Sequence, residues 1–426
     1  MRWPDALIAV MATDSRHVTA APGATIRPYP YPFKAILAIC SDLDETPDRH
    51  SYWSLMQFLN SRMSGPLGAG VGLEVGNSIY FDMPPGQFSY WGTDECGRAM
   101  IQALIRSGHI DCLHSFGDLA TSRTHAGRAL EELARHDCRI AVWVDHAIAP
   151  SNFGSDIMNG FGDVLGHPAY HADLTISYGV RYIWRGRVTS VIGQDRPSSL
   201  QGVWSGSRPL ASVRTVAKEF AKQVHSRHLK SRYRLHRRNR VLASCQLRDG
   251  GTALEFLRSN PHWGGVSSCD TADGIPDVLT ASVLDRLVER RASCVLYTHL
   301  GKRARGPRGN VLSASAVDCF RLLAERQSRG DVLVTTTKRL LDYCWYRDGM
   351  GLSVTRDTSV TRFDLSLPVD TPLAEVQGLT LYVDPATKAE VRLNGRRVTN
   401  VVANPPDETG RFSVSIPWTR LDFPTL

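Results

Sequence analysis

Acidic and imidazole side chains follow directly after several apolar runs of this sequence. Asp42 and Asp44 follow AILAIC, His114 ends HIDCLH with Asp118 four residues later, and His299 ends SCVLYTH. Carboxylate and imidazole groups in such places can bind a divalent ion, take a proton from water or give a proton to a leaving group. The residue types therefore predict a hydrolytic centre.

The spacing of these residues suggests how they meet. Asp42 and Asp44 are two residues apart, so in an extended backbone both side chains point to the same side. A divalent ion held by one carboxylate relieves their repulsion and leaves the other as a base. His114 and Asp118 share a face if the chain turns helically after the strand. Together with Asp44 they make a ligand set suited to zinc, with an open position for water.

Further polar residues are candidates for metal or substrate binding. His146 or His171 could complete the metal set, and Asp145 either orients a ligand imidazole or caps a helix. Arg248 either lies at the mouth of the site or belongs to a glycine turn. Several such groups gathered in one place are costly unless a cation or substrate compensates them. The full set of these candidates is His146, His171, Asp145, Asp173, Tyr170 and Arg248.

Short apolar runs alternate with stretches of helical period over most of the chain, which is typical of βα units on a parallel sheet. We expect helices at 93–106, 122–135, 211–225 and 314–327. About eight strands are expected at 33–40, 72–81, 109–115, 139–146, 180–184, 240–247, 293–299 and 331–337. Strands rich in Val, Ile and Leu throughout are buried on both faces, which favours an irregular (β/α) barrel of seven or eight strands; a doubly wound open sheet is the competing architecture.

The pattern changes after Gly349, where helical period gives way to alternation. Strands are expected at 379–384, 389–393 and 412–416, and Asn394-Gly395 is a strong signal for a two-residue hairpin. We therefore predict three parts: an N-terminal extension (1–30), the (β/α) barrel (31–348) and a small C-terminal β-sandwich domain (349–426).

Composition limits the class of protein. The 426 residues are 42% hydrophobic and 22% charged, enough for a full core. Nine cysteines are scattered without a CxxC pair, which favours a reducing, cytoplasmic location. The apolar run at 6–12 is too short to span a membrane.

The net charge is +8, and ten Lys or Arg residues fall between Arg214 and Arg240. A solvated face is the simpler interpretation of this stretch, and an anionic-ligand site is the alternative. No zinc finger or RNP-type motif accompanies it, so we expect no nucleic-acid partner.

From about residue 33 to 343, the chain resembles a divergent branch of the polysaccharide deacetylases of carbohydrate esterase family four. The motifs SDLDE, HSFGD and YTHL occur in the order of that family's paired aspartates, its His-containing ligand motif and its late histidine. Two departures stand out. Leu43 separates the aspartates, and Asp118 replaces the second ligand histidine.

The resemblance implies a barrel enzyme that removes N-acetyl or O-acetyl groups from a carbohydrate with a divalent metal ion, zinc by expectation. It assigns Asp42 as the base, Asp44 and His114 as metal ligands and His299 as the acid. The expected partner is an amino sugar or a surface-polysaccharide precursor.

Two other functions fit parts of the sequence. Asp42-Leu43-Asp44-Glu45-Thr46 also matches the opening motif of haloacid-dehalogenase-type phosphatases, with Asp42 as the nucleophile and Lys338 as the later lysine. That function leaves His114, His171 and His299 without roles. A glycan-binding barrel without catalytic activity is the third possibility.

Overall fold

Strand β1 (Ala35–Ser41) lies inside the main sheet, and all seven of its residues are buried. In the computed structural model, which describes residues 25–42, 46–147, 149–198, 203, 209–227, 233–261, 271–302, 312–368 and 371–426, β1 pairs in parallel with β12 (Ser293–Thr298) on one side. On the other side it pairs with β13 (Val332–Thr335) and β4 (Asn77–Ile79). Its apolar run is therefore surrounded by backbone partners and helices, as expected for a parallel-sheet strand.

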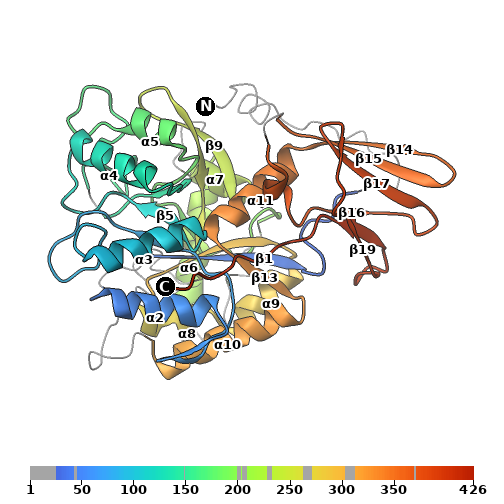
Figure 1. Cartoon of the computed structure of the whole chain (residues 1–426), viewed down its shortest axis with the longest axis horizontal. Coiled ribbons are helices and arrows are strands. Elements are labelled where there is room, and N and C mark those ends of the chain that lie inside the picture. The colour runs from blue at the N-terminus through green and yellow to red at the C-terminus, as the bar shows by residue number, and fades with distance from the viewer. Residues whose placement is uncertain are drawn as a thin grey trace.

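The main sheet has 11 strands and curls on itself, with helices around it (Figure 1). Each of the eight segments predicted as strands contains one. The order is β8 (Val188–Thr189), β11 (Arg258–Ser259), β12, β1, β4, β5 (Ile110–His114), β6 (Val142–Val144), β7 (Tyr182–Trp184), β10 (Thr252–Phe256) and β9 (Leu242–Gln246), with β13 on β1. Neighbours pair in parallel except β9 with β10, which form a hairpin.

Several helices pack an apolar stripe against this sheet. Helix α3, for example, begins after Asp94, whose side chain accepts from the Gly97 amide, and it buries Met100, Ile101 and Leu104. The four predicted helices correspond to α3, α4, α6 and α10. The helices are α2 (Arg49–Asn60), α3 (Glu95–Arg106), α4 (Arg123–Arg135), α5 (Ala172–Tyr178), α6 (Pro209–His225), α7 (Arg234–Arg237), α8 (Ile275–Val278), α9 (Ala281–Glu289), α10 (Ala314–Ser328) and α11 (Thr337–Gly349).

Two hydrophobic clusters lie on opposite sides of the sheet, because successive strand residues point to opposite faces. On β1, Leu37 and Ile39 belong to the outer cluster under the helices. Ile36, Ala38 and Cys40 belong to the inner cluster. Inner positions on the other strands are Cys112, Val142, Val144, Tyr182, Trp184, Leu254, Phe256 and Val295. This alternation fixes which residues at the strand ends face inward.

The C-terminal part holds two small sheets, at the right in Figure 1. One consists of β14 (Gly351–Arg356), β15 (Val360–Ser366), β17 (Lys388–Leu393) and β18 (Arg396–Arg397), and the other of β16 (Thr380–Tyr382), β20 (Ser413–Ser415) and β19 (Val402–Asn404). The predicted hairpin is confirmed: Asn394 and Gly395 join β17 to β18 with positive φ angles of 50° and 78°.

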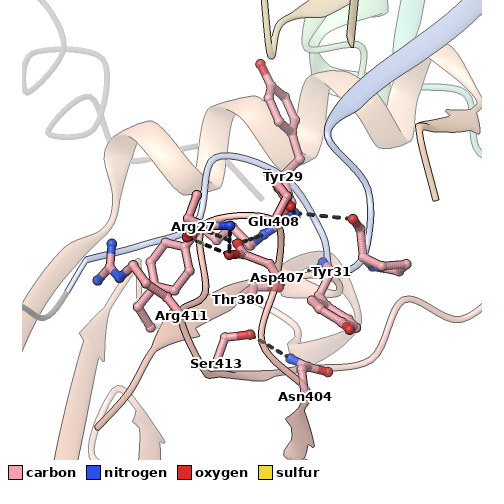
Figure 2. Close-up of polar contacts among 12 residues, drawn as sticks. Arg27, Tyr29, Tyr31, Thr380, Asn404, Asp407, Glu408, Arg411 and Ser413 are labelled. Atoms are coloured by element: carbon pink, nitrogen blue, oxygen red, sulfur yellow. Dashed lines mark hydrogen bonds and ion pairs between the residues drawn. The ribbon is translucent and has the colours of Figure 1, made fainter. Parts of the chain in front are cut away.

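Both ends of the described chain tie the parts together. Ile26 bridges Leu381 of β16, and the Arg27 side chain binds Asp407 in the same region (Figure 2). After β20 the chain returns to the α/β part, where Phe423 packs on Trp53 of α2 (Figure 1). The last residues of the predicted N-terminal extension therefore pair with the C-terminal sheets. Within the ranges given above, none of the helices combines the length and apolar character that a bilayer crossing requires.

Candidate active site

The inner stripe of the sheet continues into polar residues at the carboxyl ends of the parallel strands. Asp42 follows Cys40 by two positions, His114 follows Cys112, and His146 follows Val144. On the neighbouring strands, the same two-residue step leads to Arg258 after Phe256 and to His299 after Tyr297. The pleat alone therefore directs these five side chains into one region.

Asp42 and Arg258 form the centre of this region. Arg258 Nη1 donates to Asp42 Oδ2 at 3.0 Å, and Nη2 donates to Oδ1 at 3.2 Å. Arg258 is 0% exposed and Asp42 is 1% exposed, so both residues are buried. A two-pronged contact of this kind fixes both the position and the plane of the carboxylate.

Aromatic rings hold Arg258 in place. Its guanidinium carbon lies 4.1 Å from the centre of the Trp184 ring and 4.9 Å from that of Tyr297. Burial is the largest single influence and lowers the pKa of Arg258, but Asp42, Cys40 and Tyr297 together outweigh it and raise that pKa above its ordinary value. Arg258 is therefore a permanent cation beside Asp42.

Two imidazoles approach the same oxygen of Asp42. His114 Nε2 lies 3.7 Å from Asp42 Oδ2, and His299 Nε2 lies 4.0 Å from it. The Tyr297 hydroxyl lies 3.1 Å from His299 Nε2, within hydrogen-bonding distance. The predicted base and acid, Asp42 and His299, are thus brought together, with His114 beside them.

His146 and Asp118 extend the site toward solvent. His146 Nδ1 and Asp118 Oδ1 are 2.8 Å apart, and the Asp118 side chain is 40% exposed. The ring centres of His114 and His146 are 4.7 Å apart, and Tyr80, just after β4, stacks on His114 at 4.5 Å. His114 and Asp118 thus lie in one neighbourhood, and His146 lies between them.

The metal set of Asp44, His114 and Asp118 is only partly visible. Asp44 lies outside the described residues. Among the residues that the structure does describe, no three His, Cys, Asp or Glu side chains are spaced to hold a metal ion. His114, His146 and Asp118 have the donor types that zinc accepts, but their side chains as placed do not form such a group.

The other candidates lie around the loop between β6 and α5 (residues 149–171). Asp145 directly precedes His146, so the pleat turns its side chain to the outer side of the sheet. There its carboxylate accepts hydrogen bonds from the amides of Phe153 and Gly154 at 2.9 and 2.8 Å. His171 contacts the Ser151 carbonyl through Nε2 and the Thr175 hydroxyl through Nδ1, both at 2.8 Å. Both ring nitrogens of His171 are therefore engaged within the outer core.

Three more candidates also stabilise this part of the molecule. Arg248 Nε donates to the buried Asp163 at 2.8 Å, and the Tyr170 hydroxyl donates to Asp249 at 3.0 Å. Asp173 forms an ion pair with Arg123. The chain around Arg248 is the turn of the β9–β10 hairpin, with Gly250 at a φ of 89°. These contacts stabilise a loop, and none of them reaches Asp42.

Burial shifts the pKa values of two of these loop residues. It raises the pKa of Asp145 to about 7 and lowers the pKa of His171 to about 4. His171 is therefore neutral near pH 7, which suits its two hydrogen bonds to a carbonyl and a hydroxyl.

Reasoning from the sequence missed three residues of the site: Arg258, Tyr297 and Tyr80. Arg258 had a usable signal, because it continues the alternating inner stripe Leu254, Phe256 of a buried strand. An arginine at such a position requires a carboxylate partner.

No protein-family model matches this chain, and no curated protein matches it either.

Proposed function

We propose that this protein is a hydrolase that removes N-acetyl or O-acetyl groups from a carbohydrate. The observation that supports this most is the convergence of His114 and His299 on one oxygen of Asp42, whose carboxylate Arg258 holds in place. A base and an acid on either side of one reacting group are what hydrolysis of an acyl bond needs.

In the proposed reaction, Asp42 accepts a proton from water as the water oxygen bonds to the acyl carbon. The carbon–nitrogen bond of an amide, or the carbon–oxygen bond of an ester, then breaks. His299 gives its proton to the departing amine or alkoxide, and acetate leaves. Arg258 stays bound to Asp42 throughout and keeps its carboxylate oriented.

A divalent ion, by expectation zinc, would be held by His114 with Asp44 and Asp118, or with His146 in place of one of them. When bound, such an ion polarises the acyl carbonyl and stabilises the negative charge of the tetrahedral intermediate. The imidazole and carboxylate donors at the outer edge of the site support this part of the proposal.

The finer architecture is also a proposal. β7 leads into β8 and β10 into β11, and the pairings β7–β10, β8–β11 and β11–β12 support an irregular barrel of about seven or eight strands. Apolar residues of both small sheets, Leu365 of β15 and Leu381 of β16 among them, share one cluster, which supports a C-terminal β-sandwich. A cytoplasmic location remains part of the proposal.

The phosphatase alternative receives less support from the contacts. A covalent bond from an Asp42 oxygen to phosphorus would disrupt the two-pronged contact with Arg258, whereas a proton from water needs only a lone pair that this contact leaves open. The Lys338 ammonium binds Asp342 on α11. Neither contact favours transfer of a phosphoryl group to Asp42.

A product assay tests the proposal. The purified protein with added zinc is incubated with N-acetylated and O-acetylated oligosaccharides and with 4-nitrophenyl phosphate, and acetate and phosphate are measured. We expect acetate together with a free amine or hydroxyl group. Release of phosphate without acetate would support the phosphatase, and binding of oligosaccharide without any product would support the inactive barrel.

A further inference from the structure

A second cluster of cationic side chains lies at the opposite edge of the sheet from Asp42. It lines an open pocket of about 700 Å³, which we call the arginine pocket, with Arg196, Arg290, Arg291 and Arg411 together with Tyr382 and Thr25. Arg290 and Arg291 come just before β12, whose first residue pairs with Ile36, whereas Asp42 follows the other end of β1. The six residue steps from Ile36 to Asp42 separate these two levels by roughly 20 Å.

The acidic groups beside the pocket already have partners. Asp407 binds Arg27 Nε at 3.1 Å and accepts from the Tyr382 hydroxyl at 2.7 Å (Figure 2). Glu408 binds Arg291 at 3.0 Å and Arg27 at 3.4 Å. These two carboxylates therefore offset the charges of Arg27 and Arg291.

Arg196 and Arg290 have no such compensation. Arg196 Nε donates to the Arg291 carbonyl at 2.7 Å, and Arg290 Nη2 donates to the Pro197 carbonyl at 2.6 Å. Over the described ranges of the chain, no carboxylate lies within 4.0 Å of either guanidinium. Burial, together with the positive charges of Arg286 and Arg196, lowers the pKa of Arg290. This wall of the pocket therefore carries excess positive charge.

Arg411 supplies a cation from the C-terminal part of the chain. Its guanidinium carbon lies 3.6 Å from the centre of the Tyr382 ring, and Nη2 donates to the Thr25 hydroxyl at 3.0 Å. Figure 2 shows Arg411 beside the Arg27–Asp407 pair. Cations thus line the pocket from two separate parts of the fold.

We propose that the arginine pocket binds a ligand that carries a diphosphate group. Two adjoining phosphates present anionic oxygens to both sets of guanidinium groups, and each guanidinium can donate two hydrogen bonds to one phosphate. The buried Tyr382 ring beneath Arg411 keeps that guanidinium in place. This inference does not depend on the proposed deacetylation, because it rests on different residues at the other edge of the sheet.

A nucleoside diphosphate, a prenyl diphosphate and inorganic pyrophosphate all share this chemistry. Titration calorimetry of the full chain at low salt, with inorganic pyrophosphate as the first probe, tests the proposal. We expect one saturable site whose affinity falls as salt rises. Arg290→Gln and Arg411→Gln should each weaken binding by about tenfold or more. The control Arg397→Gln, exposed on β18, should bind pyrophosphate as the wild type does.

Three results would overturn the proposal: no saturable binding, equal weakening by the Arg397→Gln control, or loss of binding on substitution of Asp42. If Arg290→Gln fails to fold, two measurements still decide the question. One is the affinity of Arg411→Gln for pyrophosphate, and the other is the hydrogen-exchange protection that pyrophosphate gives to residues 25–28 and 409–411 of the wild type. Parallel titrations with ADP and farnesyl diphosphate identify which class of diphosphate compound the pocket binds, because the matching ligand binds more tightly than pyrophosphate alone.

Discussion

Arg258 donates hydrogen bonds to both carboxylate oxygens of Asp42, at 3.0 and 3.2 Å, although the two residues are 216 positions apart in the sequence. Both residues are buried at the carboxyl edge of the sheet, and the guanidinium of Arg258 lies over the rings of Trp184 and Tyr297. A buried charge keeps its place only when an opposite charge compensates it. This pair therefore links the stability of the sheet to the geometry of the candidate active site.

Arg258→Met should lower the free energy of unfolding by about 3–5 kcal/mol, because it leaves the Asp42 carboxylate buried without a cation. The double variant Asp42→Asn, Arg258→Met should lose clearly less than Arg258→Met alone, since both charges are gone. Urea unfolding at pH 7 of the wild type, Arg258→Met, Asp42→Asn and the double variant gives all the free energies needed. If the two single effects simply add, Asp42 and Arg258 do not stabilise one another and our account of the pair fails.

His299→Asn should slow hydrolysis of an acetamide much more than hydrolysis of 4-nitrophenyl acetate. The amine needs a proton to leave, whereas 4-nitrophenolate leaves without one. We expect a loss of about 100-fold or more on the amide and a small loss on the activated ester. Steady-state rates with both substrates provide the test. If His299→Asn lost activity equally on the amide and on the activated ester, His299 would not be the acid.

Metal content should separate the roles of His114 and Asp42. Elemental analysis of protein purified with zinc should find the ion in the wild type and in Asp42→Asn. The zinc content should be lower in His114→Ala, because an imidazole ligand is lost. Asp44→Asn should also reduce it. Full zinc occupancy in His114→Ala would show that His114 is not a ligand.

Acid should destabilise the protein partly through His171. Because its pKa is lowered to about 4 in the folded protein, against 6.5 for an ordinary histidine, the unfolded chain binds the proton more tightly between these pH values. Stability is therefore lost as pH falls from 6.5 toward 4, by about 1.4 kcal/mol per pH unit for one such group. Urea unfolding from pH 7 to pH 5 should show a smaller decrease in His171→Gln. His50→Gln, at the exposed start of α2, should keep the wild-type decrease, and the same decrease in all three proteins would contradict this role.

Local patterns were enough to locate much of the fold. Runs such as AILAIC, CL and VLYT are buried on both faces, so their apolar character appears directly in the sequence. Asn394-Gly395 specified its hairpin because few residues adopt positive φ so readily. The short strands β10 and β11 were missed, since Glu255 and Arg258 interrupt the apolar character of this stretch.

The candidate site was less readable because it depends on contacts between distant strands. Strand ends indicated Asp42, His114 and His299, but nothing near Asp42 in the sequence points to Arg258. Asp145 illustrates the opposite problem: it stands beside His146, yet the pleat turns it to the outer core, where it binds backbone amides. The position of a polar residue along a strand therefore predicts its level in the sheet. It does not predict equally well which residues it will contact.

The most direct test of the central claim is the rate of acetate release by Asp42→Asn from the substrate that the wild type deacetylates best. Asp318→Asn, exposed on α10 and paired with Arg321, is the matched control. We predict no measurable release by Asp42→Asn, with folding intact, and wild-type release by Asp318→Asn. Release by Asp42→Asn at the wild-type rate would contradict the claim that Asp42, held by Arg258, takes the proton from water.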